Sequence, residues 1–278
     1  MNYSKAIGGS FAAIIALVIA QILSQAVARI LLLVKLPVSI CNIIAGILYG
    51  VLAFLLLKVL IEKLYRLKIS DLGIPKFYIK AKWILVAVLL PVVIKGIYLL
   101  FIQGEFVSSE MSNVQIFETL SAGIFFTGIA AGFVEEMVFR GIIFHLIAKA
   151  WNIKAAILVP SVLFGVVHIL GAGYSFGNCL LVVLAGTMVG IMFSLIMLES
   201  GSIWNSGIVH AVWNVVIIGG GLAIGEKADK YSVMTYVLKT KSFAITGGSF
   251  GIEASVVALI GYVAVSAIAL VMIRNKKQ

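Results

Sequence analysis

The sequence predicts an all-α membrane protein, a polytopic bundle of about eight transmembrane helices. Of its 278 residues, 62% are hydrophobic and only 12% are charged, and the mean hydropathy is +1.17. This composition is far from that of a soluble globular domain. Because a helical span needs about 20 apolar residues, the chain has room for these spans and short connections, with no separate soluble domain.

Apolar runs place the predicted spans along the chain. They cover residues 7–28, 37–57, 83–102, 119–147, 155–170, 179–198, 202–223 and 251–273. The first run ends in Ala26-Val27-Ala28, which resembles a signal-peptidase site, but the run is long and only Lys5 precedes it, so we expect it to be retained. The fourth run is long for one span, which indicates a helix that is tilted, or broken near Gly141.

Lysine and arginine positions predict the orientation, because short cytoplasmic connections are enriched in these residues. Residues 58–82 carry Lys58, Lys63, Arg66, Lys68, Lys76, Lys80 and Lys82. Residues 103–118 carry three glutamates and no basic residue. We therefore expect 58–82 and both termini in the cytoplasm and 103–118 outside. Residues 224–250 also fall outside in this scheme, although they include four lysines.

Two further expectations come from the basic residues. The formal net charge of +10 reflects basic residues that collect at span ends, so we expect contact with the lipid bilayer and no nucleic-acid partner. Apolar side chains are mixed with the basic ones in residues 58–82, which is typical of a helix lying in the membrane interface; the alternative is a solvated loop that is basic because it is cytoplasmic.

Two adjacent carboxylates, Glu135 and Glu136, interrupt the fourth apolar run, and Arg140 follows them. A charge in the middle of a bilayer costs at least about 2.5 kcal/mol, so such residues usually face a bundle interior or a water-filled cavity and mark a functional site. Glu136 and Arg140 are four residues apart on one helix face, where they can form a buried ion pair. Glu135 points about 100° away and is free for another role.

Two other spans carry polar side chains at helical spacing. Phe164 and His168 lie one turn apart in the fifth span, and His210 and Asn214 lie one turn apart in the seventh. With a rise of about 1.5 Å per residue, His168, His210 and Glu135 fall in one layer of the membrane. One such motif alone would favour a structural polar network that fixes helix register. The three together indicate a site.

The motifs Glu-Glu-x-x-x-Arg, Phe-x-x-x-His and His-x-x-x-Asn, in this order on three helices, resemble those of the CPBP family of intramembrane proteases (CAAX protease and bacteriocin-processing, or Abi), which includes the type II CAAX prenyl endopeptidases. The resemblance implies a catalytic core in residues 119–223. Residues 1–118 would then form N-terminal spans with the basic cytoplasmic connection, and residues 224–278 an external loop and the last span. The resemblance also implies an endopeptidase that acts on a peptide or protein at the membrane. Its role would be CAAX-type processing, or bacteriocin or peptide processing and self-immunity.

The resemblance also assigns roles to the motif residues. Glu135 would be the general base on water, aided by His168, while His210 and Asn214 would stabilise the oxyanion. The supporting residues would be Glu136, Arg140 and Phe164.

A zinc ion is the other way to activate the water, and Glu135, His168 and His210 form an accepted ligand set. The chain lacks His-Glu-x-x-His, and we favour catalysis that requires no cofactor. Cys41 and Cys179 fall outside the motif helices, so serine or cysteine protease chemistry is not expected.

Two other function classes compete with a protease. A non-catalytic membrane regulator or bacteriocin-immunity scaffold would use the same polar cluster to stabilise a bundle that binds a partner protein. A transporter or proton relay would also place Glu and His in spans, but the sequence shows no repeat or inverted pair of broken helices. Lys95, mid-span in the third helix, is expected to snorkel or balance charge. Gly186 and Gly190 predict a close helix contact in the sixth span.

Overall fold

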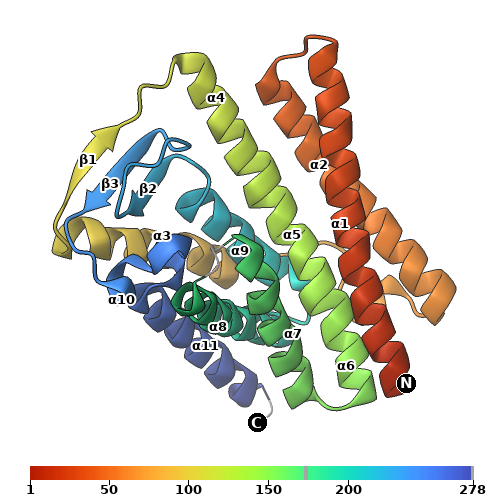
Figure 1. The fold of residues 1–278 in the computed structure, drawn as a ribbon. Helices are drawn as coiled ribbons and strands as arrows, with labels where there is room; N and C mark the ends of the chain where they lie inside the picture. Colours follow the sequence, from red (N-terminus) through yellow and green to blue (C-terminus); the bar gives the residue numbers. More distant parts are fainter. Residues whose placement is uncertain (172–174, 277–278) are drawn as a thin grey trace.

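The computed structural model describes residues 1–171 and 175–276 as a bundle of long helices with one small sheet at one end (Figure 1). Within these residues, seven helical segments are long and apolar enough to span a membrane. They are α1 (Tyr3–Leu33), α2 with its π-helical end (Val38–Tyr65), α3 (Ala81–Phe101), the run from α4 to α6 (Asn113–Ala150), α7 with its 3-10 end (Ile153–Leu170), α8 (Phe176–Ser200) and α11 (Val256–Asn275). The all-α membrane bundle is confirmed.

The seventh predicted span, residues 202–223, is shorter than expected. It contains α9 (Ile203–Ile217), a helix of 15 residues. At a rise of about 1.5 Å per residue it extends only about 22 Å, less than the hydrocarbon core of a bilayer. Most of α9 is buried among α3, α5 and α8. This helix is therefore a central element that the longer helices enclose.

The long fourth segment is one continuous helical run with two wide-turn stretches. α4 (Asn113–Ser121) starts at a capping box between Ser112 and Gln115. A π-helical stretch (Ala122–Ala130), α5 (Ala131–Glu136), a second π-helical stretch (Met137–Ile143) and α6 (Phe144–Ala150) follow. No break occurs near Gly141, which lies buried inside the second π-helical stretch. π-Helical turns often occur at functional sites, and Glu135 and Glu136 lie between these two.

Residues expected to form external loops build the sheet instead. β1 (Gly104–Ser108), β2 (Leu222–Gly225) and β3 (Met234–Leu238) are arranged in the order β1-β3-β2. β1 is antiparallel to β3, and β2 is parallel to it. α10 (Phe243–Thr246) and two 3-10 turns (Gly248–Phe250 and Ile252–Ala254) then lead into α11. The pairing confirms that the connections 103–118 and 224–250 lie at the same end of the bundle, which we call the sheet end.

Both chain termini lie at the opposite end, which we call the basic end (Figure 1). The Tyr65 hydroxyl donates to the Lys5 carbonyl at 2.9 Å. Near the C-terminus, the buried Glu199 carboxylate pairs with Lys82 at 2.7 Å and with Lys276 at 2.5 Å. The N-terminus, the C-terminus and the connection 58–82 therefore share one end, as predicted.

The connection between α2 and α3 is not the interfacial helix that its pattern indicated. Its only helix after Tyr65 is a 3-10 turn, Ile69–Leu72. Leu72 and Ile74 are buried against the bundle, and the Trp204 indole donates to the Pro75 carbonyl at 2.8 Å. Leu64 and Phe77 of this connection are exposed. The connection is therefore a loop that a few apolar side chains anchor to the end of the bundle.

The predicted close contact of the sixth span is confirmed between α7 and α8. A Cβ atom added at Gly186 would lie 2.5 Å from the Gly165 Cα atom, and one at Gly190 would lie 2.8 Å from the Ser161 Cα atom. Only glycine permits this backbone approach. The contact positions the end of α7, where His168 lies.

Candidate active site

The first motif forms a buried ion pair. Glu136 and Arg140 are both fully buried, and the Arg140 Nη1 atom donates to Glu136 Oε1 at 2.9 Å. The predicted pairing on one helix face is thus confirmed. The guanidinium also lies over the rings of Phe164 at 4.6 Å and Phe193 at 5.2 Å. The faces of these two rings attract the positive charge of the guanidinium, and they do so at a place that water does not reach.

His210 is held in one orientation by α5 and α8. Its Nδ1 atom lies 3.2 Å from Glu136 Oε1, and its ring stacks on Phe193 with centroids 4.6 Å apart. Since the carboxylate only accepts, we assign the Nδ1 proton to this bond. The Nε2 atom lies 3.7 Å from Glu135 Oε2, beyond hydrogen-bond distance. His210 therefore points its second nitrogen toward the other carboxylate.

Glu135 differs from Glu136 in its surroundings. Its side chain is 21% exposed, against 0% for Glu136. The Oε2 atom of Glu135 has no hydrogen-bond partner among the described residues. The two adjacent carboxylates therefore differ as the helix geometry predicts: Glu136 is bound in the buried ion pair, and Glu135 is partly exposed and outside that pair.

His168 comes from the end of α7 (Ile153–Val167). Its Nδ1 atom lies 2.6 Å from the Phe164 carbonyl one turn earlier. The last carbonyls of a helix lack partners within the helix, so this bond satisfies one of them and fixes the ring. With the Nδ1 proton used there, the Nε2 atom of the neutral ring is an acceptor.

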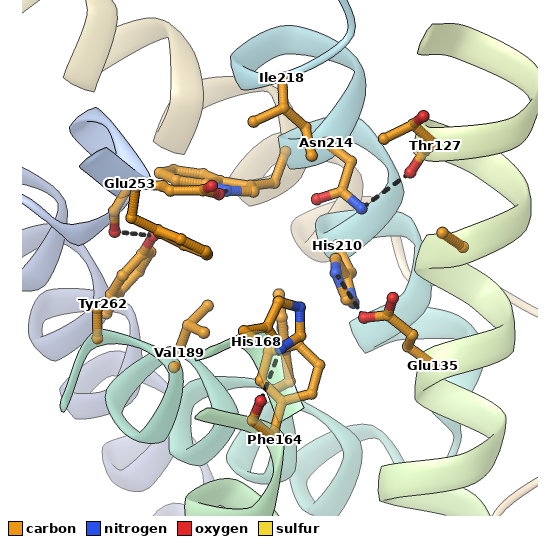
Figure 2. A pocket seen from close by; sticks show the side chains of 16 residues that line it. Thr127, Glu135, Phe164, His168, Val189, His210, Asn214, Ile218, Glu253 and Tyr262 are labelled. Atoms are coloured by element: carbon orange, nitrogen blue, oxygen red, sulfur yellow. Dashed lines mark hydrogen bonds and ion pairs between the residues drawn. The ribbon is translucent and has the colours of Figure 1, made fainter. Parts of the chain in front are cut away.

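Asn214 lies one turn beyond His210 on α9. Its Nδ2 atom donates to the Thr127 carbonyl at 3.1 Å, which ties α9 to the first π-helical stretch. This bond orients the amide so that its oxygen points away from Thr127 (Figure 2). The second Nδ2 proton is left for another acceptor.

These side chains surround one cavity of about 130 Å³ (Figure 2). Five residues predicted from the motifs line it: Glu135, Phe164, His168, His210 and Asn214. Glu136 and Arg140 lie behind this wall and are not among its lining residues. The structure thus brings together side chains of three helices, and the geometry leaves space for water beside Glu135.

The cavity has lining residues that sequence reasoning missed. Glu253, from the 3-10 turn before α11, lies on another wall and accepts a long hydrogen bond of 3.5 Å from the Trp213 indole. Phe250 and Tyr262 also line the cavity. The one available signal for Glu253 was a carboxylate at the start of the last apolar run, and that signal alone cannot place it beside the motif helices.

Lys95 and His145 lie outside the cavity lining. The Lys95 ammonium donates to the carbonyls of Val216 and Leu222, close to the end of α9. His145 Nδ1 lies 2.7 Å from the Gly141 carbonyl. Both contacts satisfy backbone carbonyls, which indicates a structural use for each side chain.

The residues present do not fit a metal centre. Within residues 1–171 and 175–276, no group of three or more His, Cys, Asp or Glu side chains is placed to hold a metal ion.

Comparison with known proteins bears on the same segment. A family model described as Type II CAAX prenyl endopeptidase Rce1-like matches residues 117–216. No curated protein and no solved structure matches the chain. The matched segment contains all three motifs and the helices that surround the cavity. Over residues 117–216, this multi-pass membrane protein is therefore similar to the Rce1-like type II CAAX prenyl endopeptidases.

Proposed function

We propose that the protein is an intramembrane endopeptidase in which Glu135 activates the attacking water. The observation that carries the proposal is that Glu135, whose side chain is 21% exposed, lines one cavity together with His168 and His210. A general base must lie within hydrogen-bond reach of the proton that it removes. A water molecule in this cavity, beside the Glu135 carboxylate, would meet that requirement.

The reaction follows from these positions. Glu135 takes a proton from water, and the water oxygen attacks the carbonyl carbon of the scissile peptide bond. His168, whose Nε2 atom is an acceptor, holds the water in line. When the tetrahedral intermediate collapses, the carbon–nitrogen bond breaks, and the proton on Glu135 passes to the leaving amine. No covalent enzyme intermediate and no cofactor are needed.

The oxyanion requires hydrogen-bond donors at the place where negative charge develops. In its doubly protonated form, His210 donates from Nδ1 to Glu136 and from Nε2 to the oxyanion. The second amide proton of Asn214, one turn away, is a further donor. The Glu136–Arg140 pair positions His210 through the 3.2 Å contact and does not itself contact the cavity.

The test compares wild-type cells with cells carrying Glu135→Gln at matched membrane abundance, by mass spectrometry that resolves peptide termini. Glu105→Gln, an exposed carboxylate on β1, is the control. We expect Glu135→Gln to lower the appearance of new termini by at least about 100-fold, the usual lower bound for loss of a general base. His168→Ala and His210→Ala should also abolish proteolysis.

Two outcomes would contradict the proposal. Wild-type turnover by folded Glu135→Gln would remove Glu135 as the base. Identical termini in wild-type and Glu135→Gln cells, with both proteins folded and inserted, would favour a non-catalytic regulator or immunity scaffold.

A further inference from the structure

The catalytic cavity continues toward the sheet end. A second cavity of about 310 Å³ shares Ile218, Phe250 and Glu253 with the first as lining residues. We call the second cavity the vestibule; it is also lined by residues 223–225 of β2, Lys227, Asp229 and residues 248–252. Figure 2 shows Ile218 on the side of the catalytic cavity opposite Phe164. The two cavities therefore share a wall that includes Ile218, and movement of this side chain would join Glu135 to the vestibule and the sheet.

The other side of the catalytic cavity is closed. The Glu136–Arg140 pair and Phe139 are buried there, with at most 3% of any of these residues exposed. Beyond them, residues 73–75 cover the start of α9: the Ile203 amide donates to the Gly73 carbonyl at 2.9 Å, and the Trp204 indole donates to the Pro75 carbonyl. No lining residue of the catalytic cavity comes from the described residues of the basic end.

Charge assigns the two ends to opposite sides of the membrane. Basic side chains gather at the basic end: Lys5, Lys58, Lys63, Arg66, Lys68, Lys76, Lys80, Lys82, Lys149, Lys154, Arg274 and Lys276. At the sheet end, four lysines of residues 224–250 are accompanied by Glu226 and Asp229, and residues 103–118 add three glutamates. Arg29 and Lys35, at the end of α1 remote from the N-terminus, also lie away from the basic end, so this side carries six basic residues against the twelve of the basic end. The excess of Lys and Arg marks the cytoplasmic side. The sheet end, and with it the vestibule, then faces away from the cytoplasm.

The vestibule suits an extended peptide. β2 is an edge strand, paired with β3 on one side only, and its residues Ala223, Ile224 and Gly225 line the vestibule. An edge strand offers unpaired backbone groups to which an extended chain can add as a further strand. Such a strand would direct the peptide backbone toward Ile218 and the catalytic cavity.

We infer that the substrate is an extended peptide segment at the extracytoplasmic face of the membrane, which enters through the vestibule alongside β2. A segment exposed on that face, such as an exported peptide or an outer loop of a membrane protein, meets this requirement. A cytoplasmic C-terminal tail does not. The cleavage of this peptide rests on the proposed function, whereas the access route rests on the cavities and the charges alone.

The test measures the labelling of single cysteines by a membrane-impermeant maleimide on intact cells and on permeabilised cells. In a Cys41→Ala, Cys179→Ala background, Lys227→Cys reports on the vestibule and Ile218→Cys on its junction with the catalytic cavity. Lys68→Cys, exposed at the basic end, is the matched control. We expect the first two to label as completely in intact cells as after permeabilisation, and Lys68→Cys to label only after permeabilisation.

Each other pattern overturns part of the inference. Labelling of Lys68→Cys but not Lys227→Cys in intact cells would reverse the orientation. Labelling of Lys227→Cys without Ile218→Cys, in intact and in permeabilised cells, would show that the vestibule does not reach the catalytic cavity.

The same labelling in a Glu135→Gln background separates this inference from the proposed function, since it does not depend on proteolysis. If mass spectrometry finds no peptide termini that depend on Glu135 but the labelling is as expected, the proposed function fails and the access route stands. If proteolysis is present, attaching a bulky maleimide to Ile218→Cys should lower it more than 10-fold, while labelled Lys68→Cys should keep its activity.

Discussion

Replacing Arg140 by alanine tests how much the buried ion pair contributes to folding. The substitution leaves the Glu136 carboxylate fully buried, with His210 Nδ1 at 3.2 Å as its one remaining hydrogen-bond partner among the described residues. Removing one partner of a buried pair typically costs about 3–5 kcal/mol, because a buried charge is left uncompensated. Loss of the contacts with Phe164 and Phe193 acts in the same direction.

The measurement is the free energy of unfolding of detergent-purified protein, obtained by titration with a denaturing detergent. Lys149→Ala is the control, since Lys149 is an exposed cation near the end of the same helical run. We expect Arg140→Ala to lose about 3–5 kcal/mol and Lys149→Ala to change by less than about 0.5 kcal/mol. The double variant Glu136→Gln, Arg140→Met should lose less than Arg140→Ala, because it buries no unpaired charge.

Equal free energies of unfolding for Arg140→Ala and Lys149→Ala would contradict the expected contribution of the buried pair to folding. The same expectation would fail if the double variant were no more stable than Arg140→Ala, since the cost would then come from lost packing and not from an uncompensated charge.

Three other predictions follow from particular contacts. Lys95→Met should lower the melting temperature while activity per folded molecule falls by less than about 10-fold, because Lys95 contacts backbone carbonyls outside the cavity. Gly132→Ala should lower activity strongly in a proteolysis assay, because the added Cβ would lie 2.8 Å from the backbone of Ala211 and would push α9 away from α5; Gly50→Ala, with nothing within 4 Å, should have no effect. Burial raises the pKa of Glu253 to about 7, so its ionised form destabilises the folded state, and stability falls as pH rises from about 4.3 through 7. Glu253→Gln should therefore melt at the wild-type temperature at pH 5 and at a higher temperature at pH 8.5, and equal melting at both values would contradict this.

Much of the candidate site was predictable because its residues repeat at helical spacing. Residues four apart face the same way on any helix, so Glu136 with Arg140, and His210 with Asn214, could be paired before any tertiary structure was known. The cost of placing charge in hydrocarbon made these few residues conspicuous. The ends of the bundle were predictable for a similar reason. Apolar runs mark the spans, and successive connections lie at alternate ends, so residues 103–118 and 224–250 were expected at one end and the basic connection at the other.

Other features depended on contacts that no local pattern encodes. The prediction of an interfacial helix in residues 58–82 was wrong, because after Tyr65 the connection is a loop with one 3-10 turn, which the buried Leu72 and Ile74 anchor to the bundle. The sheet joins β1 to strands more than 110 residues later in the chain, and β-pairing at that separation is set by the bundle that brings the connections together. Glu253 reaches the cavity only because this end of the chain folds back over it.

The sequence by itself determined that the chain crosses the membrane as a helix bundle and that Glu135, His168, His210 and Asn214 are the side chains to examine, because hydropathy and helical period are local properties. Only the tertiary structure decided that Glu135 lines a cavity while Glu136 lies behind its wall, and at which end a second cavity adjoins the first. Those properties depend on which atoms of distant helices come within a few ångströms of one another, and the packing of the whole bundle sets these distances.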